Sequence, residues 1–87
     1  MSKISQEKIE RIKEDILRIL YENYPGFMYT NDVADAVVRD NEFTLSLLKE
    51  LKKNNLLMNI EQSKGIKIKR RWTLTKITHE KYKELLS

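Results

Sequence analysis

Residues 57–75 read LMNIEQSKGIKIKRRWTLT, and this stretch decides the fold class. Apolar and polar residues alternate along two short runs, and a glycine lies between the runs. Alternation with a period of two on both sides of a short glycine-containing segment is typical of a β-hairpin. We therefore expect a hairpin with its turn at 62–65. On its second strand, one face should carry Ile66, Ile68, Arg70, Trp72 and Leu74.

The hairpin is also where positive charge concentrates. Residues 57–87 carry 8 Lys/Arg against 3 Asp/Glu, whereas residues 1–56 carry 9 against 10, which together give the net charge of +4. A cationic segment on an otherwise balanced chain indicates a surface for a polyanion. The cations of the hairpin are Lys64, Lys67, Lys69, Arg70 and Arg71.

Immediately before the hairpin, leucines recur at helical spacing and predict a helix over about 42–54. Asn54 and Asn55 should end this helix, because asparagine tolerates the left-handed backbone conformation found at helix C-termini. The expected inner face comprises Thr44, Leu47, Leu48 and Leu51.

Two further helices precede that one. The first should run over 6–23, with Ser5 as its N-cap and with Pro25 stopping it. The second should be capped by Thr30 or Asn31 and end near Arg39. Its expected buried face comprises Val33, Ala34, Val37 and Val38.

The remaining segments complete the order of elements. Residues 27–29 are expected to form a short edge strand or an extended connector, and Thr75 or Thr78 can cap a last helix that continues through Leu86. The sequence therefore predicts one domain over 1–87, mainly α with a small β-hairpin (α+β). Its order is helix, short strand, helix, helix, hairpin, helix, which is the plan of a winged helix-turn-helix.

Two stretches carry a resemblance to a known class of proteins. TNDVADAVVRDNEFTLSLLKELKKNNLL (30–57) and RRWTLTKITHEKYKELL (70–86) resemble winged helix-turn-helix transcriptional regulators of the MarR-like and PadR-like kind. The resemblance implies binding to double-stranded DNA, with helix 42–54 in the major groove and a basic wing at 58–74 on the backbone or in the minor groove. One departure is Asn55, where glycine is common.

The resemblance also implies which residues contact DNA. The five wing cations would meet phosphates, and Ser46 and Lys49 would contact bases or phosphates from the helix. Phe43 or Leu45 could touch a thymine methyl group, or either could be buried in the protein instead. Helix 42–54 has no arginine or glutamine, so specificity could depend partly on DNA shape. Two further candidates are Asn41, which could equally be a helix cap, and Lys53.

An apolar stripe on the first helix suggests a homodimer. Isoleucines recur there at the spacing of a helix seam, although the stripe could simply cover the neighbouring helices. The residues expected at the dimer interface are Ile9, Ile12, Ile16, Tyr82 and Leu86.

Other functional classes find little support. The chain has no cysteine, no glycine-rich phosphate loop and no cluster of metal-ligand residues, and His79, its only histidine, is expected to be exposed. We therefore expect no enzyme activity, metal or cofactor. No apolar run approaches the ~18 residues of a membrane span, and residues 1–5 lack a signal-peptide core, so we expect a cytoplasmic protein without a membrane partner.

Trp72 is expected in the core. The main alternative function is a winged-helix module that binds another protein. An exposed Phe43 or Leu45 beside Glu42 and Glu50 would suit such a role, whereas the basic hairpin argues against it.

Overall fold

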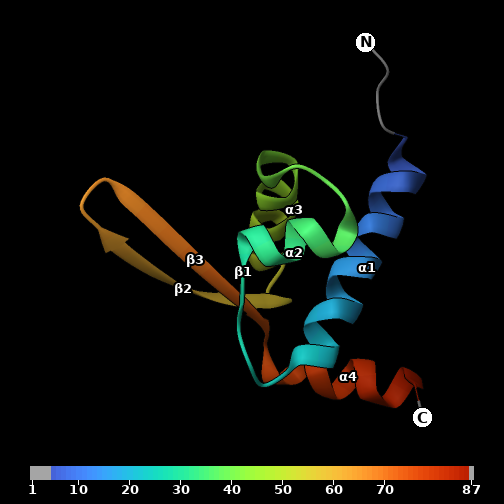
Figure 1. The fold of residues 1–87 in the computed structure, drawn as a ribbon. Coiled ribbons are helices and arrows are strands. Elements are labelled where there is room, and N and C mark those ends of the chain that lie inside the picture. Colours follow the sequence, from blue (N-terminus) through green and yellow to red (C-terminus); the bar gives the residue numbers. More distant parts are fainter. Residues whose placement is uncertain (1–4, 87) are drawn as a thin grey trace.

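The computed structural model describes residues 5–86, which form four helices and a three-stranded antiparallel sheet. Figure 1 shows a long hairpin that projects from a body of packed helices. The expected order of elements, helix, strand, helix, helix, hairpin and helix, is confirmed. Residues 1–4, where part of the signal-peptide prediction falls, lie outside the described residues. No helix within 5–86 is long and apolar enough to cross a membrane.

Helix α1 (Gln6–Asn23) has the bounds that the sequence predicts. The hydroxyl of Ser5 accepts a hydrogen bond from the backbone N–H of Lys8 at 3.2 Å, which satisfies one of the free amides of the first turn. Ile12, Ile16 and Leu20 point into the core, where each is at most 6% exposed.

Helix α2 (Thr30–Val37) begins and ends differently from the prediction. Its N-cap position is Tyr29, which makes no side-chain capping bond, so neither Thr30 nor Asn31 is the cap. The helix stops before Val38, which takes the left-handed conformation with φ 57° and ψ 49°. Val38 was expected in the core but is 84% exposed, because this backbone turns its side chain outward.

Helix α3 (Asn41–Lys53) lies one residue earlier than predicted, and its inner face is the predicted one. Asn55 has φ 64°, as expected of a residue just after a helix end. The backbone N–H groups of Asn55 and Leu56 donate to the carbonyls of Lys52 and Leu51 at 2.9 and 3.0 Å. This hydrogen-bonded C-terminal turn leads the chain directly into the hairpin.

The sheet has the order β1-β3-β2, in which β1 is Met28–Tyr29, β2 is Leu57–Lys64 and β3 is Lys67–Leu74. The predicted turn at 62–65 is wrong by two residues: β2 continues through Lys64, and the turn consists of Gly65 and Ile66. At the base of the hairpin Leu57, Trp72 and Leu74 are buried, as predicted for Trp72.

The buried base anchors the hairpin to the helices. Besides packing in the core, Trp72 donates a hydrogen bond from Nε1 to the hydroxyl of Thr30 at 2.8 Å, which links β3 to the start of α2. From 60 to 69 every residue is exposed, so the outer half of the hairpin extends away from the body.

Helix α4 (Lys76–Leu86) follows the hairpin and is capped by Thr75, whose hydroxyl accepts from the backbone N–H of Thr78 at 3.2 Å. The expectation that His79 is exposed is wrong. Its ring is half-buried and stacks on the ring of Tyr24 at 3.9 Å between centroids, which joins α4 to the end of α1.

Candidate nucleic-acid interface

Four of the five predicted wing cations share one face of the hairpin. Strand register pairs Gln62 with Lys69 and Lys64 with Lys67, and residues paired across antiparallel strands point to the same side. Arg71 lies on that side too, since it is two residues from Lys69 on β3. We call Lys64, Lys67, Lys69 and Arg71 the basic face.

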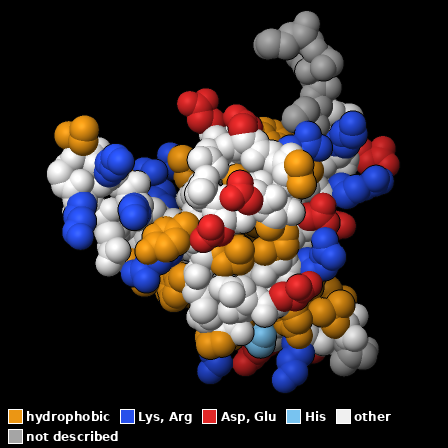
Figure 2. All heavy atoms as spheres, in the orientation of Figure 1, with side chains coloured by type: hydrophobic (Ala, Val, Ile, Leu, Met, Phe, Trp, Pro, Cys, Tyr) orange, Lys and Arg blue, Asp and Glu red, His pale blue; other side chains and the backbone are white. Residues whose placement is uncertain are grey.

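The charges of the basic face are not neutralised by the protein itself. Within residues 5–86, none of its four cations forms an ion pair with an acidic side chain. The lysines are exposed and Arg71 is half-buried. Figure 2 shows Lys and Arg side chains gathered over the projecting hairpin. The basic face therefore presents positive charge to solvent.

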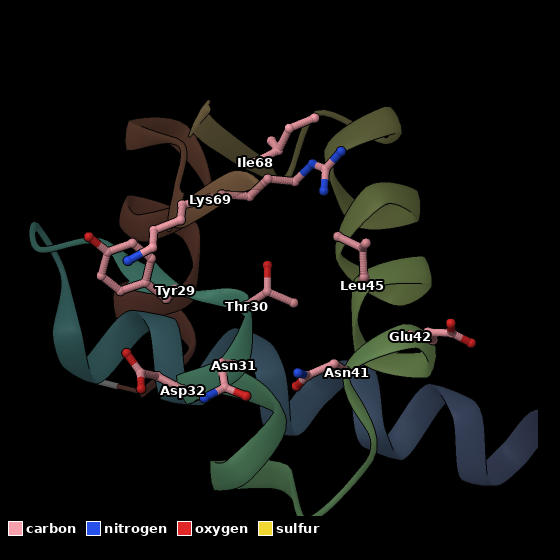
Figure 3. Close-up of a pocket in the computed structure, with 10 residues that line it drawn as sticks. Tyr29, Thr30, Asn31, Asp32, Asn41, Glu42, Leu45, Ile68 and Lys69 are labelled. Carbon is pink, nitrogen blue, oxygen red and sulfur yellow. The ribbon is translucent and has the colours of Figure 1, made fainter. Parts of the chain in front are cut away.

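Tyr29 belongs to the same surface, and sequence reasoning missed it. It pairs with Arg71 across the β1–β3 ladder, and Lys69 Nζ lies 5.7 Å and Arg71 Cζ 6.0 Å from the centre of its ring. The lysine side chain points toward the tyrosine ring in Figure 3. Cation–π attraction at these distances restrains both cations. A two-residue strand gives no periodicity from which this position could be predicted.

Arg70, the fifth predicted cation, lies on the opposite face. It pairs in register with Glu61, and its Nε donates to a carboxylate oxygen of Glu61 at 2.8 Å. This bond partly neutralises Arg70 and directs it away from the basic face. The structure thus separates Arg70 from the other four wing residues.

On α3, the predicted contact residues fall into two groups. Ser46, Lys49 and Lys53 are exposed, although the Ser46 hydroxyl donates to the carbonyl of Phe43 at 2.7 Å. Phe43 and Leu45 are half-buried and pack against the core. Most of their surface is therefore used within the protein, and little is left for a thymine methyl group.

The acidic residue near the C-terminal end of α3 is held by a neighbouring helix. Glu50 accepts from Lys13 Nζ of α1 at 2.9 Å, and this lysine is 9% exposed. A second carboxylate, Glu10, lies 3.8 Å from the same nitrogen. Glu50 is therefore turned toward α1 and its charge is offset, which weakens its repulsion of any polyanion along α3.

A groove of about 450 Å³ separates the wing from the two helices before it. Leu45 enters it from α3, and Asn41, the first residue of α3, lies at its edge (Figure 3). Asn41 is not the cap of α3, since Asp40 holds that position. The lining residues are Tyr29, Thr30, Asn31, Asp32, Asn41, Glu42, Leu45, Ile68, Lys69 and Arg70.

The predicted dimer residues are not one surface. Ile12 and Ile16 are 6% and 0% exposed because they fill the core beneath α1, so their assignment to an interface is corrected. Ile9 is half-buried against the same core. Tyr82 is half-buried with its ring 5.1 Å from that of Tyr21, and Leu86 is 62% exposed.

Sequence comparisons identify no relative of this chain. No family model matches the sequence, and no curated protein matches it.

Solved structures, in contrast, do match. A mutant of MepR from a multidrug-resistant S. aureus clinical isolate superimposes with a TM-score of 0.73 at 20% identity, over 93% of this chain and 62% of that one. ZitR of Lactococcus lactis, a zinc-responsive MarR family member, matches with a TM-score of 0.62 at 20% identity, over 97% and 62%. A protein of Enterococcus faecalis described as a MarR family transcriptional regulator matches with a TM-score of 0.63 at 19% identity, over 98% and 82%.

These matches show that the chain has the winged-helix fold found in structures of MarR family proteins. The chain spans about three fifths of the length of the MepR and ZitR structures. In terms of that fold, α2 and α3 form the helix-turn-helix and the β2–β3 hairpin is the wing.

Proposed function

We propose that this protein binds double-stranded DNA and regulates transcription, without catalysing a reaction. The observation that carries the proposal is the basic face, where Lys64, Lys67, Lys69 and Arg71 lie together on a projecting wing and form no ion pair with an acidic side chain of residues 5–86. Each phosphate that such a cation neutralises releases condensed counterions, which favours binding without requiring a particular base sequence. The likeness in fold to MarR family structures supports the same conclusion.

We place α3 in the major groove, which is wide enough to admit a helix. Lys49 and Lys53 are exposed along it and can donate hydrogen bonds to phosphates or base edges. The hydroxyl of Ser46, which donates to the carbonyl of Phe43, can accept a hydrogen bond from a base edge, and Asn41 lies in the first turn. The pairing of Glu50 with Lys13 weakens one source of repulsion in this approach. Because α3 offers no arginine or glutamine, we assign it a modest share of base reading.

We further propose that the protein acts as a homodimer. The exposed apolar residues of α4 supply the surface, above all Leu86 with Tyr82 beside it, and the half-buried Ile9 of α1 could add to it. A two-fold dimer would place two α3 helices about 34–36 Å apart, one turn of DNA, on a palindromic site.

The alternative function, a protein-binding module, has less support. It relied on Phe43 or Leu45 being exposed beside Glu42 and Glu50. Both apolar side chains are half-buried against the core, and Glu50 is occupied by Lys13.

Two measurements test the proposed function. Fluorescence anisotropy with a labelled random duplex should show binding at about 50 mM salt that weakens steeply as salt rises. Selection of bound sequences from a random pool, together with the solution mass, should give a palindromic consensus and the mass of two chains. No association with duplex DNA at low salt would refute DNA binding, and a monomer that selects a non-repeated site would refute the dimer.

A further inference from the structure

The tip of the wing carries an apolar side chain that the fold does not use. Ile66 is 99% exposed at the turn between β2 and β3, whereas the exposed apolar residues nearer the base, Met58 and Ile60, keep about half of their surface covered. Single exposed apolar residues are common on proteins, so exposure alone decides nothing. The position within the turn and the neighbouring charges carry the argument.

The turn itself does not call for isoleucine. Gly65 has φ 62° while Ile66 has no positive φ, which is the pattern of a type II′ turn. The second position of such two-residue turns is usually occupied by Asn, Asp or Ser, which bond to water or to the local backbone. Ile66 has no polar side-chain atom for such bonds and, at 99% exposure, does not pack against the core formed by the described residues, so folding gains little from its side chain.

Two cations flank this apolar tip. Lys64 and Lys67 are direct partners at the end of the ladder, on either side of Gly65 and Ile66. The tip also extends well away from the body, because the three register steps from the Glu61–Arg70 pair to the Lys64–Lys67 pair span roughly 10 Å. An exposed apolar side chain between two lysines at the end of the projecting hairpin is chemically suited to a DNA groove bordered by phosphates.

The dimensions of the minor groove determine how the tip could enter it. The minor groove of B-DNA is about 6 Å wide, and two paired strands are already about 4.8 Å apart before side chains are added. The paired strands therefore remain outside while one side chain at the turn can enter. Apolar side chains that enter the minor groove in this way separate adjacent base pairs and bend the duplex toward the major groove.

We infer that Ile66 is a wedge that enters the minor groove, opens a base step and makes the protein select deformable DNA. The inference rests on the proposed function and adds to it a specificity-determining residue. Pyrimidine–purine steps such as TA and CA unstack most readily, so they are the class of sequence that this wedge would select. Such selection compensates for the lack of arginine and glutamine on α3.

The test compares two duplexes of equal length and base composition that share the site bound by α3. In one duplex the segments on either side of that site, where the wing would lie, contain TA steps, and in the other the same bases form A-tracts. The wild-type protein should bind the TA duplex about fivefold more tightly, the low end of the effect of one altered base-pair position. Energy transfer between dyes at the duplex ends should report bending. Ile66→Ser should abolish both the preference and the bend, and Ile66→Leu should retain them. Since Ile66 touches no core residue, both variants should fold.

Controls separate this inference from the proposed function. Lys67→Ala should weaken binding to both duplexes equally, whereas Ile66→Ser should leave the salt dependence unchanged because no phosphate contact is lost. If the Ile66→Ser variant keeps both the preference for the TA duplex and the bending of the duplex, the wedge is refuted and the DNA-binding proposal is unaffected. A wild-type protein that binds neither duplex would overturn the wedge together with the DNA-binding proposal, whereas an Ile66 that is needed only for binding anionic lipid vesicles would overturn the wedge alone.

Discussion

Removing the three lysines of the basic face should flatten the salt dependence of DNA binding. Lys64, Lys67 and Lys69 are exposed and unpaired within the described chain, so each can neutralise one phosphate. The slope of log affinity against log salt is negative, and its magnitude should decrease by about 2.7 when all three are changed to alanine, at about 0.9 per contact. Between about 50 and 200 mM salt, the wild-type protein should therefore lose roughly fortyfold more affinity than the triple variant. Anisotropy titrations at several salt concentrations measure both slopes.

A matched variant distinguishes position from total charge. Changing Lys76, Lys81 and Lys83 of α4 to alanine also lowers the net charge from +4 to +1, but these exposed lysines lie on another element. This control should keep a slope close to that of the wild-type protein. If the two triple variants have the same slope, or the α4 variant has the flatter one, the assignment of the basic face to phosphates is refuted.

Three single substitutions test other parts of the structure. Glu61→Gln frees Arg70 from its 2.8 Å ion pair and should steepen the salt slope by up to about 0.9; an unchanged slope would mean that Arg70 does not reach a phosphate. Val38→Asn should raise the free energy of unfolding in urea by about 1 kcal/mol, because asparagine tolerates the left-handed backbone that strains valine, and a loss of stability would contradict the assigned φ of 57°. Thr30→Val should lower the free energy of unfolding by about 1–3 kcal/mol, since it leaves the buried Nε1 of Trp72 without an acceptor, while Thr30→Ser should be nearly neutral. The fluorescence of the single tryptophan reports the unfolding of both variants, and equal stabilities would argue against the bond.

The parts of the fold that follow from periodicity were predictable. Leucine spacing identified the inner face of α3, and alternation identified the hairpin, because both patterns record directly which side of an element is buried. Ser5 and Asn55 were predictable as well, since their roles depend on local backbone chemistry. The end of α2 was not: nothing in the sequence indicates that a valine takes the left-handed conformation.

Alternation along the second strand already separates Arg70 from Lys67, Lys69 and Arg71, but the partner of Arg70 depended on strand register. The pattern placed the turn at 62–65, but alternation continues equally well through Lys64, so sequence alone could not fix which residues pair. With the turn at Gly65 and Ile66, Arg70 pairs with Glu61, and the other four cations have no acidic partner within the part of the chain that the structure describes.

Contacts between elements far apart in the chain likewise could not be predicted from the sequence. The position of Tyr29 beside Arg71 required knowing which edge of the hairpin β1 joins. The stacking of His79 on Tyr24 required the placement of α4 against α1. The burial of Ile12 and Ile16 required the depth of the core under α1, which the spacing of an apolar stripe does not give.

The ion pair between Lys13 and Glu50 couples the position of α1 to that of α3. The Lys13 side chain is only 11% exposed, so a rotation of α1 that carried it away from α3 would strain its 2.9 Å contact with Glu50. A displacement of α1 would thereby act directly on α3 through this contact. The position of α3, the helix that we place in the major groove, therefore depends in part on the position of α1.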